Sequence, residues 1–240
     1  MTAQLMRTLA FTCLISASLM FTTSPLCAEQ RPAVVELFTS EGCSSCPPAE
    51  AYVGELAQRP DVLALSFHVD YWDELGWRDR FEIPEASPRQ RGYAKALNRP
   101  SVYTPQIVID GREDFVGSDR QKIGRALSDA RSGIPMTIDV RDSLLHIDVV
   151  AMPGISPSEV LLVPYRRTAV SAIGRGENSG RTITEYNIVR SVQHLGSFTG
   201  ECEKYAANVA SLPEDATDVA VLVQVLGQGQ IIAAATRSLR

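Results

Sequence analysis

The residues best suited to chemistry are two cysteines, Cys43 and Cys46, which two serines separate. They follow a short β-prone run and precede a helical pattern, so they lie at a predicted strand-to-helix turn. At that position, unpaired N–H groups and the positive end of a helix stabilise a thiolate. We therefore expect a redox-active pair in which Cys43 is the attacking thiol, ionised and reachable from solvent. Cys46, further along and more buried, then resolves the mixed disulfide.

Other interpretations of the cysteine pair remain open. A zinc site needs four ligands, and because no second Cys-x-x-Cys pair or His-x-His cluster is present, zinc is disfavoured. Cu(I) prefers soft thiolate ligands, so Cys43, Cys46 and His68 together could make a copper-handling protein. The pair could also be a permanent structural disulfide. The chain would then be a non-catalytic interaction protein.

The dipeptide Thr104-Pro105 stands directly before a predicted hairpin strand. Thioredoxin-like folds carry a cis proline at the start of such a hairpin, packed against the cysteine pair, and the arrangement here resembles that superfamily. The resemblance implies a cis Thr104-Pro105 bond. It also implies that the Thr104 backbone is presented to an extended substrate segment. A trans proline at the first residue of a strand is the alternative.

Three further residues are candidates for accessory roles. Glu36 is polar within an apolar strand, and the thioredoxin resemblance implies a buried acid that moves protons for the second cysteine; a solvent-facing Glu36 is the alternative. His68 ends the next predicted strand and could be a proton donor, a metal ligand or a partner for nearby backbone. Trp72, with Tyr71 and Trp77, could form a recognition surface or simply pack on the sheet.

The first half of the chain, before residues 131–135, alternates strand-like and helix-like segments. A strand, a helix and a second strand in succession predict a right-handed parallel unit. Ser118 and Gln121 are spaced as in a capping box. The expected elements are a strand over 34–38, a helix from Pro47 to Arg59-Pro60, a strand over 62–69, a helical insertion at about 71–99, a hairpin over 106–116, and a closing helix with a buried stripe of Ile123, Ala126, Leu127 and Ala130.

The second half has short runs with period-two patterning, separated by turns rich in Gly, Pro and Ser. This pattern favours an antiparallel β-sandwich. A small helical piece is expected around residues 203–210. The expected strands lie over 136–140, 144–151, 159–165, 182–192, 218–226 and 231–235.

The N-terminus is typical of an export signal. Arg7 precedes an apolar stretch over residues 9–21 that is too short to span a bilayer, and cleavage is expected after Ala28. We therefore expect a secreted or periplasmic protein with no membrane association once residues 1–28 are removed. The net charge of −5 argues against a nucleic-acid partner. Of the cysteines after residue 28, Cys202 is expected to be unpaired.

Several longer stretches resemble one secreted bacterial family, called domain of unknown function 1223. These stretches are residues 36–50 around the cysteines, residues 67–77, residues 103–106 and residues 176–182. The resemblance implies a thioredoxin-like fold with an appended β domain, and it names no substrate. The predicted fold is therefore α/β, with a thioredoxin-like domain over 29–133 that carries the insertion, and an antiparallel β-sandwich domain over 134–240.

These observations together favour an exported thiol-disulfide oxidoreductase. Its partners would be disulfides of envelope proteins or of small thiols, and the Cys43–Cys46 disulfide would be its only redox group, without a separate cofactor. The copper-handling protein and the non-catalytic interaction protein are the alternatives.

Overall fold

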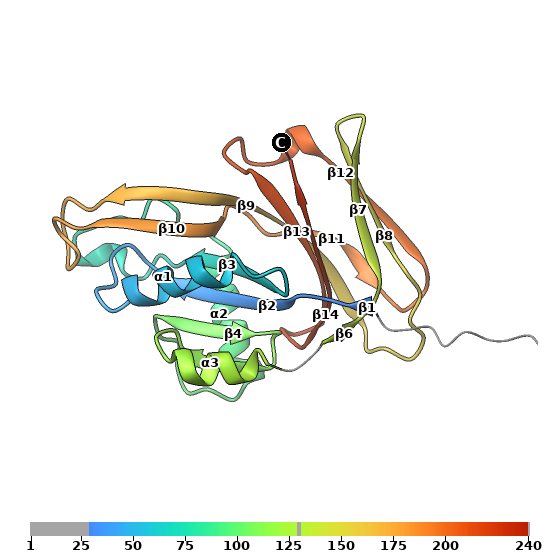
Figure 1. The fold of residues 1–240 in the computed structure, drawn as a ribbon, viewed down its shortest axis with the longest axis horizontal. Helices are drawn as coiled ribbons and strands as arrows, with labels where there is room; N and C mark the ends of the chain where they lie inside the picture. Colours follow the sequence, from blue (N-terminus) through green and yellow to red (C-terminus); the bar gives the residue numbers. More distant parts are fainter. Residues whose placement is uncertain (1–28, 129–130, 240) are drawn as a thin grey trace, which may run out of the picture.

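The computed structural model describes residues 29–128 and 131–239, so the predicted leader over residues 1–28 and Ala130 lie outside the described residues. The described part is a mixed α/β structure made mostly of strands (Figure 1). Its helices are α1 (Pro47–Leu56), α2 (Ala86–Ala96) and α3 (Arg120–Ala126), with short 3-10 turns η1 (Asp73–Leu75) and η2 (Val209–Ser211). Its strands are β1 (Glu29–Gln30), β2 (Ala33–Thr39), β3 (Val62–His68), β4 (Gln106–Ile109), β5 (Glu113–Val116), β6 (Ser132–Gly133), β7 (Met136–Arg141), β8 (Leu144–Val149), β9 (Ser158–Ala172), β10 (Thr182–Val189), β11 (Gln193–Phe198), β12 (Glu203–Asn208), β13 (Asp218–Val225) and β14 (Ile231–Ser238).

Strand β2 is central to the first half of the chain, with β3 parallel on one side and β4 antiparallel on the other. Its seven residues are all buried. Val35 and Leu37 pack with α1 and α3. Val34 and Phe38 face the other way, as alternate strand residues must, and pack with Tyr93 of α2. Helices on both faces explain why the strand reads as an almost continuous apolar run.

The local predictions for this half are confirmed at β2, α1, β3 and the β4–β5 hairpin. Helix α1 begins with Pro47 and Pro48, which fit because the first turn of a helix needs no N–H partners within the helix. The predicted cap of α3 is wrong, because the side chain that accepts the N–H of Lys122 belongs to Asp119 and not to Ser118.

The main sheet continues from the first half of the chain into the second. Strand β10 lies parallel to β3, and β9 pairs with β10, β11 and β13. Among the described residues this sheet has nine strands in the order β14-β13-β9-β10-β3-β2-β4-β5, with β11 beside β9. The predicted boundary at residues 131–135 lies between α3 and β7 and does not divide the sheet. Strand β9 is fifteen residues long (Figure 1). One end of it pairs with β10, which lies beside β3 of the first half, and the other end pairs with β11 and β13.

A second sheet of three strands, in the order β12-β8-β7, lies against the far end of the main sheet. Ile138 and Ile147 of this sheet share one apolar core with Leu162 and Val221 of the main sheet. The helix predicted around residues 203–210 is wrong, because residues 203–208 form β12 and pair in register with β8. Strand β11 was not expected, since its sequence is polar and contains a glycine.

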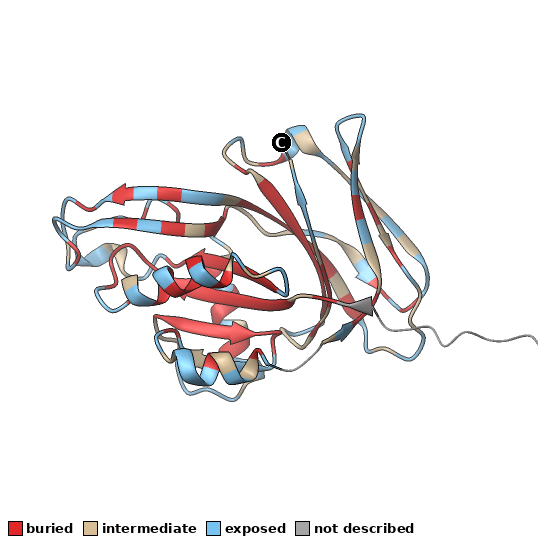
Figure 2. Cartoon of the chain, in the orientation of Figure 1, coloured by how far each residue is buried: buried red, intermediate tan, exposed pale blue. Residues whose placement is uncertain are grey.

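Buried residues are concentrated in the central strands of the main sheet. Figure 2 shows buried residues throughout β2, β3 and β4 and along most of β13. Strands β7 and β12 alternate between buried or half-buried and exposed positions, as expected for a sheet with one face in solvent. None of the helices found in residues 29–128 and 131–239 has the length and apolar character to cross a membrane.

Candidate functional site

Cys43 and Cys46 form a disulfide, with their Cα atoms 5.4 Å apart. Cys46 is the residue directly before α1, and Cys43 lies in the turn that connects β2 to it. The N–H of Cys43 bonds to the carbonyl of Ser40, and the N–H of Cys46 bonds to the carbonyl of Cys43. We call residues 40–46 the redox turn, after the redox role that the sequence predicts for this pair. The predicted position of the pair between a strand and a helix is confirmed, and Cys202 is free and exposed.

The expected exposure of Cys43 is wrong for this disulfide form. Cys43 and Cys46 are both fully buried, whereas the two serines between them are exposed. Trp72 lies against the turn, since a Cβ added at Gly42 would meet the Cβ of Trp72 at 3.1 Å. The half-buried Thr104 approaches from the segment that precedes β4, with its hydroxyl 3.3 Å from Cys43 Sγ. Residues remote in sequence therefore cover the sulfur.

The start of α1 offers fewer backbone donors than its sequence position implies. Pro47 and Pro48 have no N–H group. The next two N–H groups, of Ala49 and Glu50, both bond to the carbonyl of Cys46. The helix dipole is retained, but these four residues leave no free backbone N–H for a thiolate.

The Thr104-Pro105 bond is cis, as the sequence resemblance implied. Pro105 is buried, and its Cβ lies 2.9 Å from the position of a Cβ built on Gly117. The Thr104 hydroxyl accepts a hydrogen bond from Trp72 Nε1 at 2.9 Å and donates to Cys43 Sγ. Trp72, Thr104 and Cys43 thus form one chain of contacts that reaches the disulfide.

Glu36 does not belong to this group. Its carboxylate accepts two hydrogen bonds from Arg89 of α2, at 2.7 and 3.1 Å, and one from the Tyr93 hydroxyl. The residue is fully buried, so the solvent-facing interpretation is wrong. The side chain faces α2, whereas the helix that follows the cysteines packs on the other face of the sheet. Its predicted proton role for the second cysteine therefore has no support from its position.

His68 is fully buried at the end of β3, with Nδ1 2.8 Å from Asp79 Oδ2. Burial alone would favour the neutral ring, but the charge and hydrogen bond of Asp79 prevail and raise the pKa of His68 to about 9. Its Nε2 has no protein partner. Within the described residues, no group of three or more His, Cys, Asp and Glu side chains is arranged to hold a metal ion, including the predicted set of Cys43, Cys46 and His68.

Two buried carboxyl groups near His68 were not predicted. Glu50 of α1 accepts a hydrogen bond from the Thr39 hydroxyl at 2.6 Å, and Glu185 of β10 accepts one from Ser171 at 2.7 Å. Each has a second oxygen without a protein partner. Burial raises the pKa of both groups to about 7. Glu50 could have been found from sequence, because it lies three residues before Val53 on the apolar face of α1.

The hairpin between β9 and β10 reaches the redox turn from the second half of the chain. The side-chain amide of Asn178 donates to the carbonyls of Glu41 and Cys43, both at 2.9 Å. The carboxylate of Glu41 accepts from Trp77 Nε1 at 2.7 Å and from Arg80 at 3.2 Å. Asn178 belongs to the stretch over residues 176–182 that carried part of the family resemblance, so this stretch now has a structural role.

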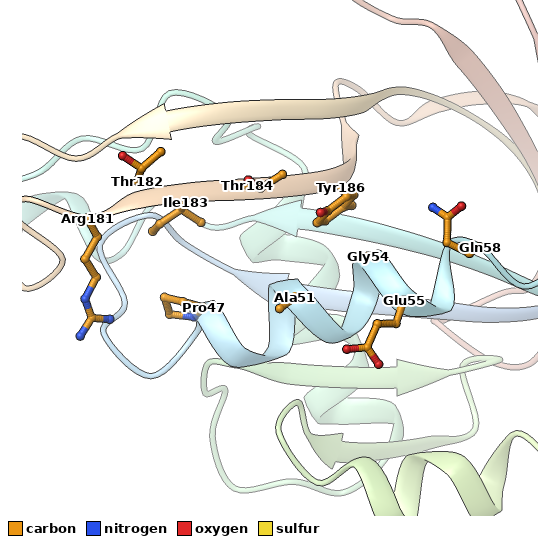
Figure 3. A pocket seen from close by; sticks show the side chains of 10 residues that line it. All are labelled: Pro47, Ala51, Gly54, Glu55, Gln58, Arg181, Thr182, Ile183, Thr184 and Tyr186. Carbon is orange, nitrogen blue, oxygen red and sulfur yellow. The ribbon is translucent and has the colours of Figure 1, made fainter.

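A groove of about 820 Å³ lies between α1 and β10 and begins at Pro47, directly after the disulfide (Figure 3). Gly54 allows the helix to approach Tyr186 closely, since a Cβ there would lie 2.5 Å from the ring. Arg181 and Glu55 provide charged side chains. The ten lining residues are Pro47, Ala51, Gly54, Glu55, Gln58, Arg181, Thr182, Ile183, Thr184 and Tyr186.

The fold and the site define a mixed α/β protein with a disulfide between a central strand and the helix that follows it. The chain belongs to the family described as protein of unknown function, DUF1223, whose model matches residues 34–224. It is similar to the crystal structure of protein AGR_C_4864 from Agrobacterium tumefaciens, with 29% sequence identity and a TM-score of 0.73 over 88% of this chain and 96% of that one. No curated protein matches the chain.

Proposed function

We propose that this protein is an exported thiol-disulfide oxidoreductase that acts through the Cys43–Cys46 disulfide. The observation that carries the proposal is the contact between Cys43 Sγ and the hydroxyl of Thr104 at 3.3 Å, which joins the disulfide to the residue before the cis proline. A purely structural disulfide would need no such hydrogen-bond donor at its sulfur. The substrate would be a disulfide or dithiol of an envelope protein or a small thiol.

A thioredoxin-like arrangement of residues 29–133 forms part of this proposal. The strand order β3-β2-β4-β5, with β2 and β3 parallel and helices on both faces, supports it. The core shared by the two sheets supports a sandwich-like second half over residues 134–240. In this arrangement the second half of the chain also contributes to the sheet of the first half, because its strand β10 pairs with β3.

The proposed exchange is balanced between the protein and a substrate that carries two thiols. One substrate sulfur, as thiolate, attacks Cys43 Sγ; the Cys43–Cys46 bond breaks, and Cys46 leaves as a thiolate and takes up a proton. The second substrate thiol loses its proton and attacks the substrate sulfur of the mixed disulfide, which releases Cys43. Cys43 leaves as a thiolate, so two electrons and one proton pass from the substrate to the cysteines. The reverse sequence reduces a substrate disulfide.

Access to Cys43 requires that its cover be displaced. Trp72 is half-buried and belongs to a segment in which Tyr71 and Leu75 are exposed by 39% and 55%. Because these two neighbours of Trp72 are exposed, local opening of the segment costs less than unfolding of the core. A substrate that displaces Trp72 and Thr104 would reach the disulfide.

The test is to trap partners with Cys46→Ser in a Cys202→Ser background, because the exposed Cys202 would otherwise form adducts of its own. We expect mixed disulfides at Cys43 from envelope extracts, and none with the matched control Cys43→Ser, Cys202→Ser. The unaltered protein should exchange with dithiothreitol. Absence of both the exchange and the trapped species would contradict the proposed function.

A further inference from the structure

The β9–β10 hairpin is tied to the redox turn by one fully buried side chain, Asn178. Its amide nitrogen donates to two carbonyls of the turn, those of Glu41 and Cys43. Its amide oxygen accepts a hydrogen bond from Arg181 at 3.0 Å. Both polar groups of Asn178 are therefore used, one toward the turn and the other toward an arginine. An asparagine buried at this depth is stable only because these bonds satisfy it.

Arg181 lies beside the redox turn with its charge uncompensated. Figure 3 shows its side chain pointing from the start of β10 toward the turn that precedes α1. The residue is exposed, and among the described residues no carboxylate lies within ion-pair distance of it. A guanidinium near a cysteine favours the thiolate.

The other charged groups around the turn are largely paired. Glu41 in the turn is paired with Arg80, and Asp79 is paired with His68. Glu50 of α1 and Glu185 of β10 are buried carboxyl groups with a raised pKa. The exposed tip of the hairpin adds one charge of each sign, at Arg175 and Glu177. Arg181 is therefore the unbalanced positive charge that can act on a Cys43 thiolate.

The first four residues of α1 have no free backbone N–H to offer, so a Cys43 thiolate depends on groups outside the helix, among them the hydroxyls of Thr104 and Ser45 at 3.3 and 3.4 Å from Sγ. Pro47 and Pro48 lack the group, and the N–H groups of Ala49 and Glu50 are bonded to Cys46. In a turn of this kind without the prolines, the helix itself would supply donors to the sulfur.

We propose that Asn178 and Arg181 are positioning residues that set the ionisation of Cys43. Asn178 fixes the redox turn through its carbonyls, and Arg181, held in turn by Asn178, places a positive charge beside it. This inference rests on the proposed function, because a thiolate at Cys43 has consequences only if the pair exchanges. It gives the second half of the chain a part in tuning the chemistry of the first.

A lower thiol pKa stabilises the reduced pair and makes the disulfide a stronger oxidant. Loss of either residue should therefore raise the pKa of Cys43 and shift the equilibrium with glutathione toward the disulfide. Because Arg181 is exposed, its share of the effect should weaken at high salt, whereas the share of the buried Asn178 should not.

The experiment measures the pH dependence of Cys43 alkylation by iodoacetamide in the reduced protein, with the modified peptide identified by mass spectrometry. Asn178→Ala and Arg181→Gln are compared with Ser179→Ala, which removes a bond within the same hairpin, to Gly174, without touching the turn. We expect both variants to raise the pKa of Cys43 by about one and to shift the glutathione equilibrium several-fold. Ser179→Ala should match the unaltered protein.

An unchanged alkylation profile in folded Asn178→Ala and Arg181→Gln would overturn the proposal. If Asn178→Ala does not fold, Arg181→Gln decides alone, since its side chain is exposed and its loss leaves the core intact. The profile needs no substrate, so its outcome is separate from that of the trapping experiment. A protein that traps no partner but shows these shifts would lose the proposed function and keep the electrostatic role of the hairpin.

Discussion

Nδ1 of His68 lies 2.8 Å from Oδ2 of Asp79, and neither side chain has any exposed area. The pair connects the end of β3 to the redox turn, because the same Asp79 oxygen accepts the N–H of Glu41 at 2.7 Å. Asp79 also accepts the N–H of Phe81 at 2.8 Å, which fixes the segment that follows Trp77. The ion pair therefore holds together the strand, the turn and the inserted segment that surround the disulfide.

Stability should fall as the pH rises from about 5 to above 9. The pKa of His68 is raised from 6.5 to about 9, so its contribution is fully present below pH 6.5 and is lost as the pH rises through 9. The pKa values of Glu50 and Glu185 are raised from 4.5 to about 7, so their folded-state protons stabilise below pH 4.5 and this advantage is lost as the pH rises through 7. Thermal melts across this range measure the effect.

Glu50→Gln should reduce the pH dependence between 4.5 and 7 and leave the part due to Glu185, because the amide keeps the shape of the protonated acid but cannot ionise. The matched control is Glu55→Gln on the exposed side of the same helix, whose carboxylate pairs with Arg120. A melting curve for Glu50→Gln with the full pH dependence of the unaltered protein would show that this carboxyl does not titrate in the folded state.

The buried pair of Arg89 and Glu36 should be more important for stability than for redox chemistry. Arg89→Met leaves the Glu36 carboxylate buried without its counter-charge, so we expect a loss of about 3 to 5 kcal/mol. Urea unfolding measures it. The surface pair of Arg120 and Glu55 provides the comparison, and Arg120→Met should change stability far less.

If the disulfide in folded Arg89→Met reacts with dithiothreitol at the same rate as in the unaltered protein, Glu36 has no part in the exchange. A large change in that rate would restore the proton role that the sequence resemblance implied for Glu36.

The sequence was most informative where structure depends on neighbours along the chain. Prolines at 47, 48 and 60 bound the first helix, and the continuous apolar run of β3 predicts a strand covered on both faces. The cis Thr104-Pro105 bond followed from resemblance, since an X-Pro bond alone does not determine its isomer.

Features that depend on distant pairing were not predictable in this way. The junction of β10 with β3 joins residues about 120 positions apart, such as Ser66 and Tyr186, and period-two patterning does not reveal which strands are neighbours. The surroundings of Cys43 include Thr104, which contacts its sulfur, and Trp72, which bonds to Thr104, and the two approach from different segments. Asn178 lies 135 residues from Cys43 in sequence, and no local signal links them.

Removal of the indole that bonds to Thr104 should speed reduction of the disulfide. Trp72→Ala deletes the hydrogen bond to Thr104 and opens the cover of Cys43, so we expect reduction by dithiothreitol to be about fivefold to tenfold faster. The neighbouring Leu75→Ala, at an exposed position of the same segment, should leave the rate unchanged. Equal rates for Trp72→Ala and the unaltered protein would show that the indole is not the barrier to access.

The close approach of α1 to β10 should depend on a single glycine. A Cβ at Gly54 would lie 2.5 Å from the ring of Tyr186, so Gly54→Ala forces the helix and the strand apart and should destabilise the protein by about 1 to 3 kcal/mol. Gly124 of α3 is the matched control, because a Cβ there meets nothing within 4 Å. Gly124→Ala should therefore stabilise the protein by about 0.4 to 1 kcal/mol. Urea unfolding measures the change in stability for both variants. A loss for Gly54→Ala together with a gain for Gly124→Ala would assign the loss to the contact between α1 and β10. A stabilising Gly54→Ala would contradict the packing of β10 on α1.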